Sequence, residues 1–298
     1  MSYAELHCHS YYSFHDGASS LEELLVRAKE LGYGALALTE HDNLCGAMRF
    51  AQLTKSLGLK GIIGAEVTLK GGAHLTLLAR DGAGYRNLSQ LLTAAHQSGE
   101  RNIPELPPEL LPQHAAGLIT LSGCPQGELS QLLSANNYTA ARQLVQQYRE
   151  WFGPDGYYLE LQQNLVYGDT ERNRKLAALG KEYGIKLAAT GNVHYHVRER
   201  HQLQDCLVAI RHCLNLEESH RERRANSEFY LRPVADMENI FRDYPEALAN
   251  TMEIAGQCTL DLTKDLSYIF PEYAAPDGLT PDAYLEKLCH EAAVRRYG

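Results

Sequence analysis

Short apolar segments alternate with amphipathic stretches along the first 190 residues of the chain. The apolar segments have the length of strands, whereas stretches such as residues 21–31 repeat apolar positions at helical spacing. Ser19 and Ser20 stand three residues before Glu22 and Glu23, the spacing of a capping box, and Gly32 closes that helix. The predicted strands are residues 3–8, 35–39, 61–69, 74–79, 117–122, 157–162 and 185–190, and the predicted helices are about 21–31, 44–57, 85–96, 128–133, 139–152 and 170–183.

This alternation predicts an α/β fold with mostly parallel strands, and about seven strand–helix units bring it close to a (β/α) barrel. Beyond residue 191 the pattern is mostly helical, with an edge-strand candidate at residues 229–232. Residues 268–281 are rich in Pro, Tyr and acidic residues and resemble a linker, and residues 282–297 form an amphipathic helix pattern. We therefore expect one domain over residues 1–262, followed by a linker and helix over 263–298.

The composition argues against several classes of protein. The sequence has no apolar run of membrane-spanning length and no signal-peptide pattern, so we expect a cytoplasmic protein without a membrane partner. Seven cysteines without a C-x-x-C pair argue against a disulfide framework and against a zinc finger. A net charge of −9 would repel a phosphate backbone at long range, so a nucleic-acid substrate would need local positive groups, metal ions or a neighbouring domain.

Histidines and carboxylates follow the predicted strands at their carboxyl ends. In a parallel βα barrel these ends meet at one face, where catalytic side chains gather. Any single histidine of this kind is more often structural than a metal ligand, so the recurrence at successive strand ends carries the inference. The residues placed in this way are His7, His9, His41, Glu66, Cys124, Asn192 and His194, and His74 joins them if the fourth strand runs antiparallel to the third.

His7 and His9 form an H-x-H pair at the end of the first predicted strand. Side chains alternate between the two faces of a strand, so both imidazoles point to the same face. Two imidazoles and a bridging carboxylate make a site for zinc, manganese or iron. The pair alone is a moderate signal, because strands carry such pairs by chance.

Seven short motifs occur in a fixed order. They are residues 5–10 (ELHCHS), 13–18 (SFHDGA), 37–42 (ALTEHD), 64–66 (GAE), 74–79 (HLTLLA), 121–125 (LSGCP) and 189–194 (ATGNVH). With them the chain closely resembles the PHP (polymerase and histidinol phosphatase) superfamily, and within it the N-terminal domain of bacterial family C DNA polymerases, the polymerase III alpha subunits. Residues 203–211 and 246–251 extend the resemblance to about residue 260, and residues 191–200 resemble the error-prone branch.

The resemblance implies a distorted (β/α)7 barrel of the PHP type with up to three divalent ions (Zn, Mn or Fe). Asp16 is chosen as a ligand over its neighbour His15, which serves other branches. Carried over residue by residue, one metal would be held by His7, His9, Glu66 and Asn192, a second by Glu66, His74 and Cys124, and a third by Asp16, His41 and His194. The resemblance gives catalytic roles to His7, His9, Glu66 and His194.

Four positions carry alternatives. Asn192 stands where the motif more often has Asp, so we expect the first metal to bind more weakly but its site not to be empty. Cys124 is also compatible with a buried thiol that packs as a small hydrophobic residue. Arg198 and Arg200 follow the last ligand and could bind a substrate phosphate, although a solvated charged loop would have the same residues.

The resemblance implies phosphoester hydrolysis, as a 3′–5′ exonuclease acting on DNA 3′ ends in a polymerase III alpha-type protein. One alternative is a non-catalytic metal-binding domain that supports a polymerase region in the same or a partner chain. Another is a stand-alone phosphatase for small phosphoesters. A metal-dependent amidohydrolase would need a strand-end lysine and a late general-base aspartate, and neither stands where it is needed. Residues 280–298 resemble the helix that opens the polymerase region, and the sequence leaves both an excised domain and a natural short protein open.

Overall fold

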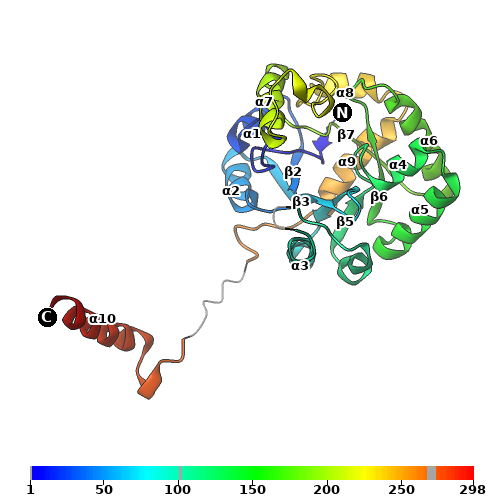
Figure 1. The fold of residues 1–298 in the computed structure, drawn as a ribbon. Coiled ribbons are helices and arrows are strands. Elements are labelled where there is room, and N and C mark those ends of the chain that lie inside the picture. Colours follow the sequence, from blue (N-terminus) through cyan, green and yellow to red (C-terminus); the bar gives the residue numbers. More distant parts are fainter. Residues whose placement is uncertain (1, 101–102, 267–272) are drawn as a thin grey trace. The chain divides into compact units, whose positions relative to one another are not determined.

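The computed structural model describes residues 2–100, 103–266 and 273–298 (Figure 1). It divides into one unit of residues 1–265 and a second unit of residues 266–298. The second unit contains the predicted terminal helix, α10 (Pro281–Tyr297), which is capped by Thr280, whose Oγ1 accepts a hydrogen bond from the N–H of Ala283. The predicted linker lies partly outside the described residues. Of the helices in the described segments, none has both the length and the apolar character needed to cross a membrane.

The first unit is built around seven strands that follow one another around the sheet in chain order. Pairing is parallel except where β4 runs antiparallel to both β3 and β5. The strands are β1 (Ala4–Glu5), β2 (Ala35–His41), β3 (Lys60–Thr68), β4 (His74–Ala79), β5 (Leu118–Leu121), β6 (Tyr157–Gln162) and β7 (Leu187–Thr190). The predicted distorted (β/α)7 barrel is confirmed, with the antiparallel fourth strand as its distortion.

The barrel is nearly closed by residues that follow its first and last strands. Cys8 forms an isolated parallel bridge with Val193, with the N–H of His9 2.8 Å from the carbonyl oxygen of Val193. The N–H of Val193 in turn lies 2.9 Å from the carbonyl oxygen of His7. The first strand ends at Glu5 and is shorter than the predicted 3–8, although the carbonyl oxygen of Cys8 still accepts a hydrogen bond of 2.9 Å from the N–H of Thr39 on β2. Backbone closure places the H-x-H pair beside residues 192–194.

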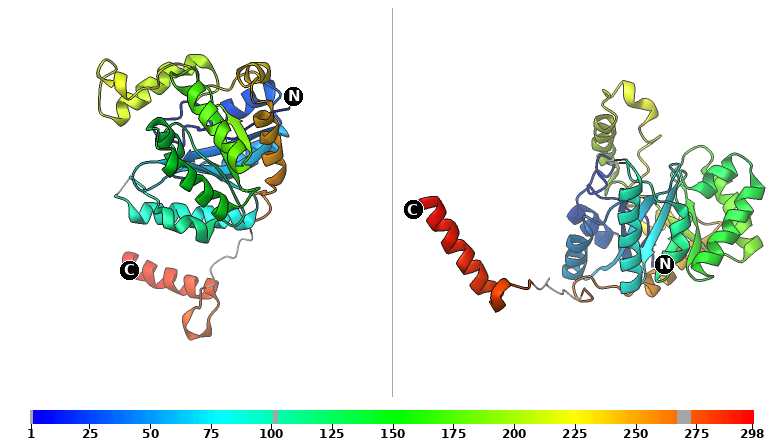
Figure 2. Two further views of the ribbon diagram at one scale, coloured as in Figure 1. Left: turned by 90° about the vertical axis from the view of Figure 1, so that its right-hand side faces the viewer. Right: turned by 60° about the horizontal axis from the view of Figure 1, so that its bottom comes forward.

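Helices surround the barrel (Figures 1 and 2). The helices are α1 (Leu21–Glu30), α2 (Ala47–Leu57), α3 (Gly82–Ser98), α4 (Glu128–Ser134), α5 (Tyr138–Phe152), α6 (Asp169–Tyr183), α7 (His201–Arg211), α8 (Val234–Ile240) and α9 (Pro245–Gln257). The predicted capping box is present at Ser20 and Glu23. The predicted edge strand at 229–232 is wrong, since only an isolated bridge between Tyr195 and Tyr230 forms there.

One end of the barrel is apolar and the other is polar. The apolar cluster joins the strands to α9 and contains Ala4, Leu6, Ala35, Ala37, Ile62, Leu78, Ile119, Leu121, Tyr158, Ala188, Ile254, Ala255 and Cys258. Side chains two residues apart on a strand share a face, so Ile62 lies on the face of Glu66, and Tyr158 on that of Glu160. The same strand faces therefore supply a packed floor at one end and polar groups at the other.

Helix α3 offers a matched pair of glycines for testing how tightly it packs. A Cβ on Gly84 would lie 1.8 Å from the carbonyl oxygen of Gly117, whereas a Cβ on Gly82 meets nothing within 4 Å. We expect Gly84→Ala to lower the free energy of unfolding by about 1–3 kcal/mol through overpacking against rigid backbone. Gly82→Ala is expected to leave stability unchanged or raise it by up to about 1 kcal/mol. Urea denaturation of the two variants measures this difference, and equal midpoints would contradict it.

Candidate metal centre

The structure brings all nine predicted metal ligands to the carboxyl end of the barrel. His41 ends β2 and Glu66 lies in the last part of β3, while His74 begins the antiparallel β4 and so reaches the same end. The remaining six come from the loops that follow β1, β5 and β7, namely His7, His9, Asp16, Cys124, Asn192 and His194. The strand-end pattern of the sequence therefore converges in space.

Glu66 lies at the centre of the cluster and is buried. Its Oε1 is 3.3 Å from Nε2 of His7 and 3.3 Å from Nδ1 of His74. Its Oε2 is 3.6 Å from Nε2 of His9 and 3.1 Å from Nδ1 of His41. Burial alone would raise the pKa of this carboxyl, but the surrounding histidines hold it well below its usual range. One carboxylate thus faces four imidazoles, two on each oxygen.

Three overlapping groups of side chains in the described residues could each hold a metal ion. The first is His7, His9 and Glu66, the second is His41, Glu66 and His74, and the third is His9, His41 and His194. Within each group the ligand atoms lie within 4.8 Å of one another. Glu66 belongs to two groups, as a bridging carboxylate would, and His9 and His41 also belong to two.

Several buried polar atoms in this cluster have no hydrogen-bond partner among the described residues. They include Nε2 of His7, Nε2 of His9, Oε1 of Glu66 and Oδ1 of Asn192. A buried polar atom without a partner is unfavourable by about 1–3 kcal/mol, and several together in one place call for a ligand. Nitrogen and oxygen lone pairs that converge at these spacings fit divalent transition metals.

Hydrogen bonds on the far side of the rings set the tautomers of three histidines. Nδ1 of His7 is 2.7 Å from Oε1 of Glu160, and Nδ1 of His194 is 2.9 Å from the carbonyl oxygen of Asn192. Nδ1 of His9 is 3.0 Å from Oγ of Ser13. With an acceptor at Nδ1, each ring carries a proton there, and Nε2 is the atom that faces the cluster. Burial opposes a charge on His7, but Glu160 and Glu66 raise its pKa to about 10, so an ion held at its Nε2 would displace a proton.

Ser13 is an acceptor for His9 because Glu40 takes the hydroxyl proton. Glu40 is buried, and it accepts hydrogen bonds from the hydroxyls of Ser10 and Ser13 and from the N–H of Ser10. The single proton of Ser13 Oγ is therefore committed to Glu40, and the oxygen accepts from the N–H of His41 at 3.0 Å as well as from His9. Ser13 and Glu40 lie within the sequence motifs, but no role could be assigned to them from sequence, because their contact with His9 forms only in the folded chain.

Asp16 faces the cluster, whereas its neighbour does not. Asp16 is buried, and its Oδ2 is 2.9 Å from Nε2 of His41 and 3.2 Å from Nε2 of His194. Burial opposes its charge, but His194 and Arg224 hold the pKa of this carboxyl well below its usual range. His15 is exposed and has a φ of 60°. The choice of Asp16 over His15 thus agrees with the direction of the two side chains.

Cys124 and Asn192 lie at the edge of the cluster. The Sγ of Cys124 is 3.6 Å from Nδ1 of His74, and burial raises the pKa of its thiol well above the usual range. Asn192 donates from Nδ2 to Oε1 of Gln162 at 3.3 Å, which leaves Oδ1 as the free atom of its amide. Its φ of 48° is left-handed, a conformation that Asn adopts more readily than most residues.

A cavity of about 590 Å³ opens above the cluster. Seven of the nine predicted ligands line it, while His7 and His9 lie beneath. Arg198 and Arg200 do not line it: Arg198 pairs with Glu228 at 2.9 Å, and Arg200 pairs with Glu23. The arginines that do line it are Arg172, Arg211, Arg221, Arg223 and Arg224.

Arg224 is the residue of this site that sequence reasoning missed most clearly. Its guanidinium lies 3.2 Å from Oδ1 of Asp16, contacts His194 and lies 4.7 Å from the ring centroid of Phe229. The sequence feature that could have indicated Arg224 is the charged run Arg221–Arg224 (RERR). A charged run far from the ligand motifs, however, predicts a solvated loop. Only the tertiary fold returns this loop to the cluster.

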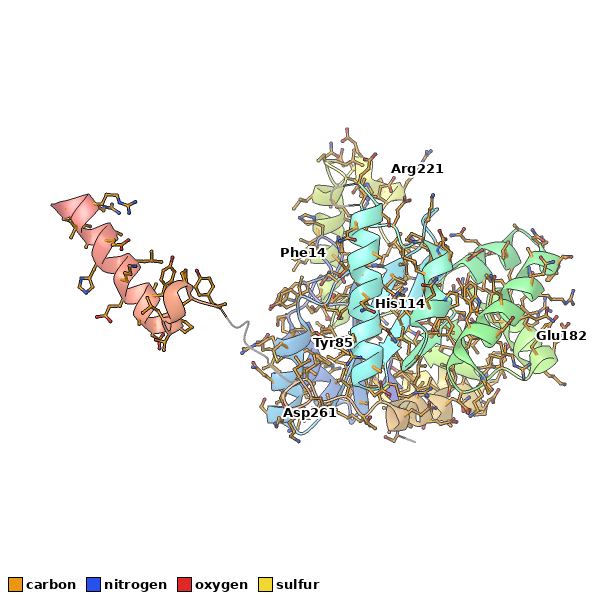
Figure 3. The ribbon with its side chains drawn as sticks, turned by 90° about the horizontal axis from the view of Figure 1, so that it is seen from below. Phe14, Tyr85, His114, Glu182, Arg221 and Asp261 are labelled. Atoms are coloured by element: carbon orange, nitrogen blue, oxygen red, sulfur yellow. The ribbon has the colours of Figure 1, made fainter. Side chains whose placement is uncertain are left out.

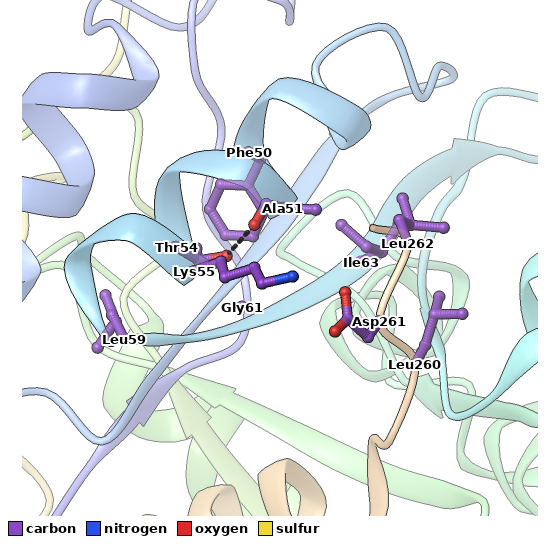
Figure 4. Close-up of a pocket in the computed structure, with 10 residues that line it drawn as sticks. All are labelled: Phe50, Ala51, Thr54, Lys55, Leu59, Gly61, Ile63, Leu260, Asp261 and Leu262. Atoms are coloured by element: carbon purple, nitrogen blue, oxygen red, sulfur yellow. Dashed lines mark hydrogen bonds between the residues drawn. The ribbon is translucent and has the colours of Figure 1, made fainter. Parts of the chain in front are cut away.

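A second, smaller hollow of about 200 Å³ lies beside α2 and the start of β3 (Figure 4). Residues 260–262 form its other wall, and the amine of Lys55 is 2.9 Å from Oγ1 of Thr263. Gly61 and Ile63 line it near the amino end of β3, whereas Glu66 follows toward the carboxyl end. None of the predicted site residues lines this hollow.

Several known proteins are similar to this chain in sequence. The family model described as the PHP domain matches residues 5–164. An error-prone DNA polymerase of Symbiobacterium thermophilum is 40% identical over the whole chain, which spans 29% of that protein. A DNA polymerase III subunit alpha of Treponema pallidum is 36% identical over the whole chain, which spans 27% of it. The chain thus spans less than a third of the length of these relatives.

Among solved structures, a protein from Bifidobacterium adolescentis assigned as a metal-dependent phosphoesterase aligns with a TM-score of 0.46 and 15% identity, over 65% of this chain and 88% of that chain. The family match itself covers more than half of the sequence and includes His7, His9, Asp16, His41, Glu66, His74 and Cys124. The chain therefore belongs to the PHP domain family.

Proposed function

We propose that this domain is a metal-dependent phosphoesterase that binds up to three divalent ions (Zn, Mn or Fe) and cleaves DNA from its 3′ end as a 3′–5′ exonuclease. The observation that carries the proposal is Glu66, a buried carboxylate surrounded by four imidazoles, with Nε2 of His7 and Nε2 of His9 turned toward it and without a hydrogen-bond partner among the described residues. A purely structural core would leave such atoms hydrogen-bonded.

We assign the ligands of the first ion as His7, His9, Glu66 and Asn192, those of the second as Glu66, His74 and Cys124, and those of the third as Asp16, His41 and His194. The spacing of His7, His9 and Glu66 supports the first set. Glu66 and His74 also occur together in a group, as do His41 and His194, which supports the other two sets. His9 and His41 lie close enough to a neighbouring set to be shared.

Divalent ions at these positions supply Lewis-acid polarisation of a phosphoester and neutralise its charge. The residues of the chain orient and enclose that chemistry. Glu160, Ser13 and the carbonyl of Asn192 hold three imidazoles in the tautomer that presents Nε2. Because His7 and His9 lie beneath the cavity, a substrate would meet the layer of His41, His74 and His194 first.

The polymerase relatives support a place for this domain beside a polymerase region, in the same or a partner chain, and hence in the cytoplasm. Proofreading by the domain would then act on a strand end delivered from that region. The net charge of −9 fits this arrangement, because a domain that repels DNA at long range benefits from a substrate handed over locally.

Activity should depend on the cluster. With Mn²⁺ or Zn²⁺, we expect wild-type protein to release nucleotides from a 3′-labelled single strand faster than it hydrolyses histidinol phosphate. His9→Ala and Glu66→Ala should each lower this rate by at least about 100-fold, since loss of even an outer partner lowers metal-site activity about 10–100-fold. His114→Ala, which changes a histidine that does not line the cavity, is the matched control (Figure 3). Metal-loaded protein that turns over neither substrate would favour a structural role, and unchanged rates in both variants would refute the assignment.

The hydrogen bond from His9 to Ser13 gives a prediction on metal affinity. Ser13→Ala removes the acceptor at Nδ1 of His9, so the ring is free to protonate Nε2, and we expect Mn²⁺ affinity to fall about 10–100-fold. Ser10→Ala also removes a hydroxyl that donates to Glu40 but touches no imidazole of the cluster, so its effect should be smaller. Isothermal titration calorimetry on folded protein compares the two, and equal losses would assign the effect to Glu40 rather than to His9.

Asn192 is expected to weaken the binding of the first ion without abolishing it. The free Oδ1 can ligate a metal but carries no net charge, so Asn192→Asp should raise the affinity for the weakest ion by about tenfold, in line with the dependence of affinity on ligand charge. Metal analysis of wild-type protein in saturating Mn²⁺ or Zn²⁺ should find at least two ions per chain. Fewer than two ions, or no gain in Asn192→Asp, would contradict the assignment.

A further inference from the structure

The cavity above the cluster has a floor and a rim of opposite charge. Asp16, Asp42 and Glu66 lie at the strand ends that form its floor. Its rim is formed by arginines from α7, from the end of η3 (Glu218–Arg221) and from the loop after it, together with His212 and Glu222. A floor of carboxylates attracts cations, whereas a rim of guanidiniums attracts anions. The two layers therefore suit two different groups of one bound molecule.

Two of the rim arginines are available to a ligand. Arg223 pairs with Asp205 at 2.9 Å, and Arg224 is engaged by Asp16. Arg211 and Arg221 are exposed, and neither has a carboxylate within ion-pair distance in the part of the chain that the structure describes. Figure 3 shows Arg221 at the outer edge of the molecule. Guanidiniums of this kind match the geometry of a phosphate.

An aromatic residue lines the same cavity. The side chain of Tyr167 is fully exposed, at 103% of its reference area, and Leu165 beside it is 61% exposed. Leaving a large apolar surface in water forgoes the stabilisation that burying it would give. A ring presented at the mouth of a polar cavity is suited to cover a flat, apolar face of a ligand.

The loop that carries Tyr167 is held firmly. Oδ2 of Asp169 accepts hydrogen bonds from the N–H groups of Asn164 and Val166 at 2.9 and 3.0 Å, and Oδ1 of Asp169 pairs with Arg172 at 2.8 Å. The amide of Asn226 adds a bond of 2.8 Å to the carbonyl oxygen of Asn164. This bracing fixes the backbone on both sides of Tyr167, so stacking on its ring requires little ordering of the loop.

We propose that Arg211, Arg221 and Tyr167 form a strand-binding subsite, in which the arginines hold a phosphate other than the one at the metal cluster and the tyrosine stacks on a base. The ligand class is a single-stranded nucleic-acid end with at least two phosphates. The proposal rests on the proposed function in taking the cluster as the place of the scissile phosphate. Base–aromatic stacking and guanidinium–phosphate contacts are the two interactions by which proteins bind single strands without reading sequence.

The subsite explains how a domain of net charge −9 can bind a polyanion. At physiological ionic strength, charges are screened beyond about 8 Å, so the two arginines at the rim outweigh the distant acidic surface for a phosphate in contact with them. A small phosphomonoester would reach the cluster but would leave both arginines and the ring unused. The subsite therefore favours a strand end over a free monoester.

Binding tests the subsite apart from turnover. Fluorescence anisotropy would follow a fluorescein-labelled single-stranded dT8 with phosphorothioate linkages, titrated with the Mn²⁺-loaded domain. We expect Arg221→Ala to weaken binding about tenfold and to lower the slope of log affinity against log salt by about 0.7. Tyr167→Ala should also weaken binding about tenfold, whereas Tyr167→Phe keeps the ring and most of the affinity.

Arg149→Ala is the matched control for charge, because Arg149 is exposed on α5 and does not line the cavity. Its salt slope and affinity should equal those of the wild type. Wild-type affinity in both Arg221→Ala and Tyr167→Ala would overturn the subsite, and so would an equal loss in Arg149→Ala. Circular dichroism melting curves confirm that each variant is folded before its affinity is compared.

Hydrolysis separates this inference from the proposed function. In Arg221→Ala, the loss of kcat/KM on the oligonucleotide should exceed the loss on bis(p-nitrophenyl) phosphate, a small diester with one phosphate, by about tenfold. Equal losses on both substrates would overturn the subsite while leaving a phosphoesterase. If the variants change strand binding as expected but the wild-type protein hydrolyses neither substrate, the proposed function is refuted and the subsite is supported.

Discussion

The carboxylate of Glu66 is the constraint on which the rest of this site depends. A buried carboxylate is unfavourable unless positive or donor groups surround it, and Glu66 has four imidazoles within 3.6 Å and a pKa held well below its usual range. The four rings come from after β1, from β2 and from β4, so the segments must converge before the carboxylate is compensated. The same convergence creates the unpartnered lone pairs to which we assign metal ions.

The barrel accommodates this polar centre because it keeps the polar groups apart from the hydrophobic core. Along the shared strand faces, residues such as Ile62 and Tyr158 pack against α9, and Glu66 and Glu160 follow toward the carboxyl ends. Beneath the rings, a second layer of acceptors holds the imidazoles, with Glu160 at His7 and the Ser13–Glu40 pair at His9. Buried groups that do not line the cavity therefore decide which nitrogen of each of these rings carries the proton.

Much of the architecture could be predicted, because strand and helix periods are local. The seven strands, the capping box at Ser20 and the placement of His74 at the ligand end through an antiparallel β4 all follow from patterns within a few residues. The errors lie where pairing is not local. The first strand ends at Glu5, with Cys8 beyond it in an isolated bridge to Val193, and the predicted edge strand at 229–232 is likewise only a bridge.

The sequence by itself determined which histidines, carboxylates and thiol stand after the predicted strands, and in which order, because strand ends can be read from local patterns, and these ends meet at one face of a barrel. Only the tertiary structure decided what surrounds that set. Arg198 and Arg200, close after the last motif, pair with Glu228 and Glu23 and do not line the cavity, while Arg221 and Arg224, more than twenty residues later, do. Proximity in sequence does not fix the direction of a loop. Long-range contacts do, since the charge that a loop presents depends on which carboxylates the fold places beside it.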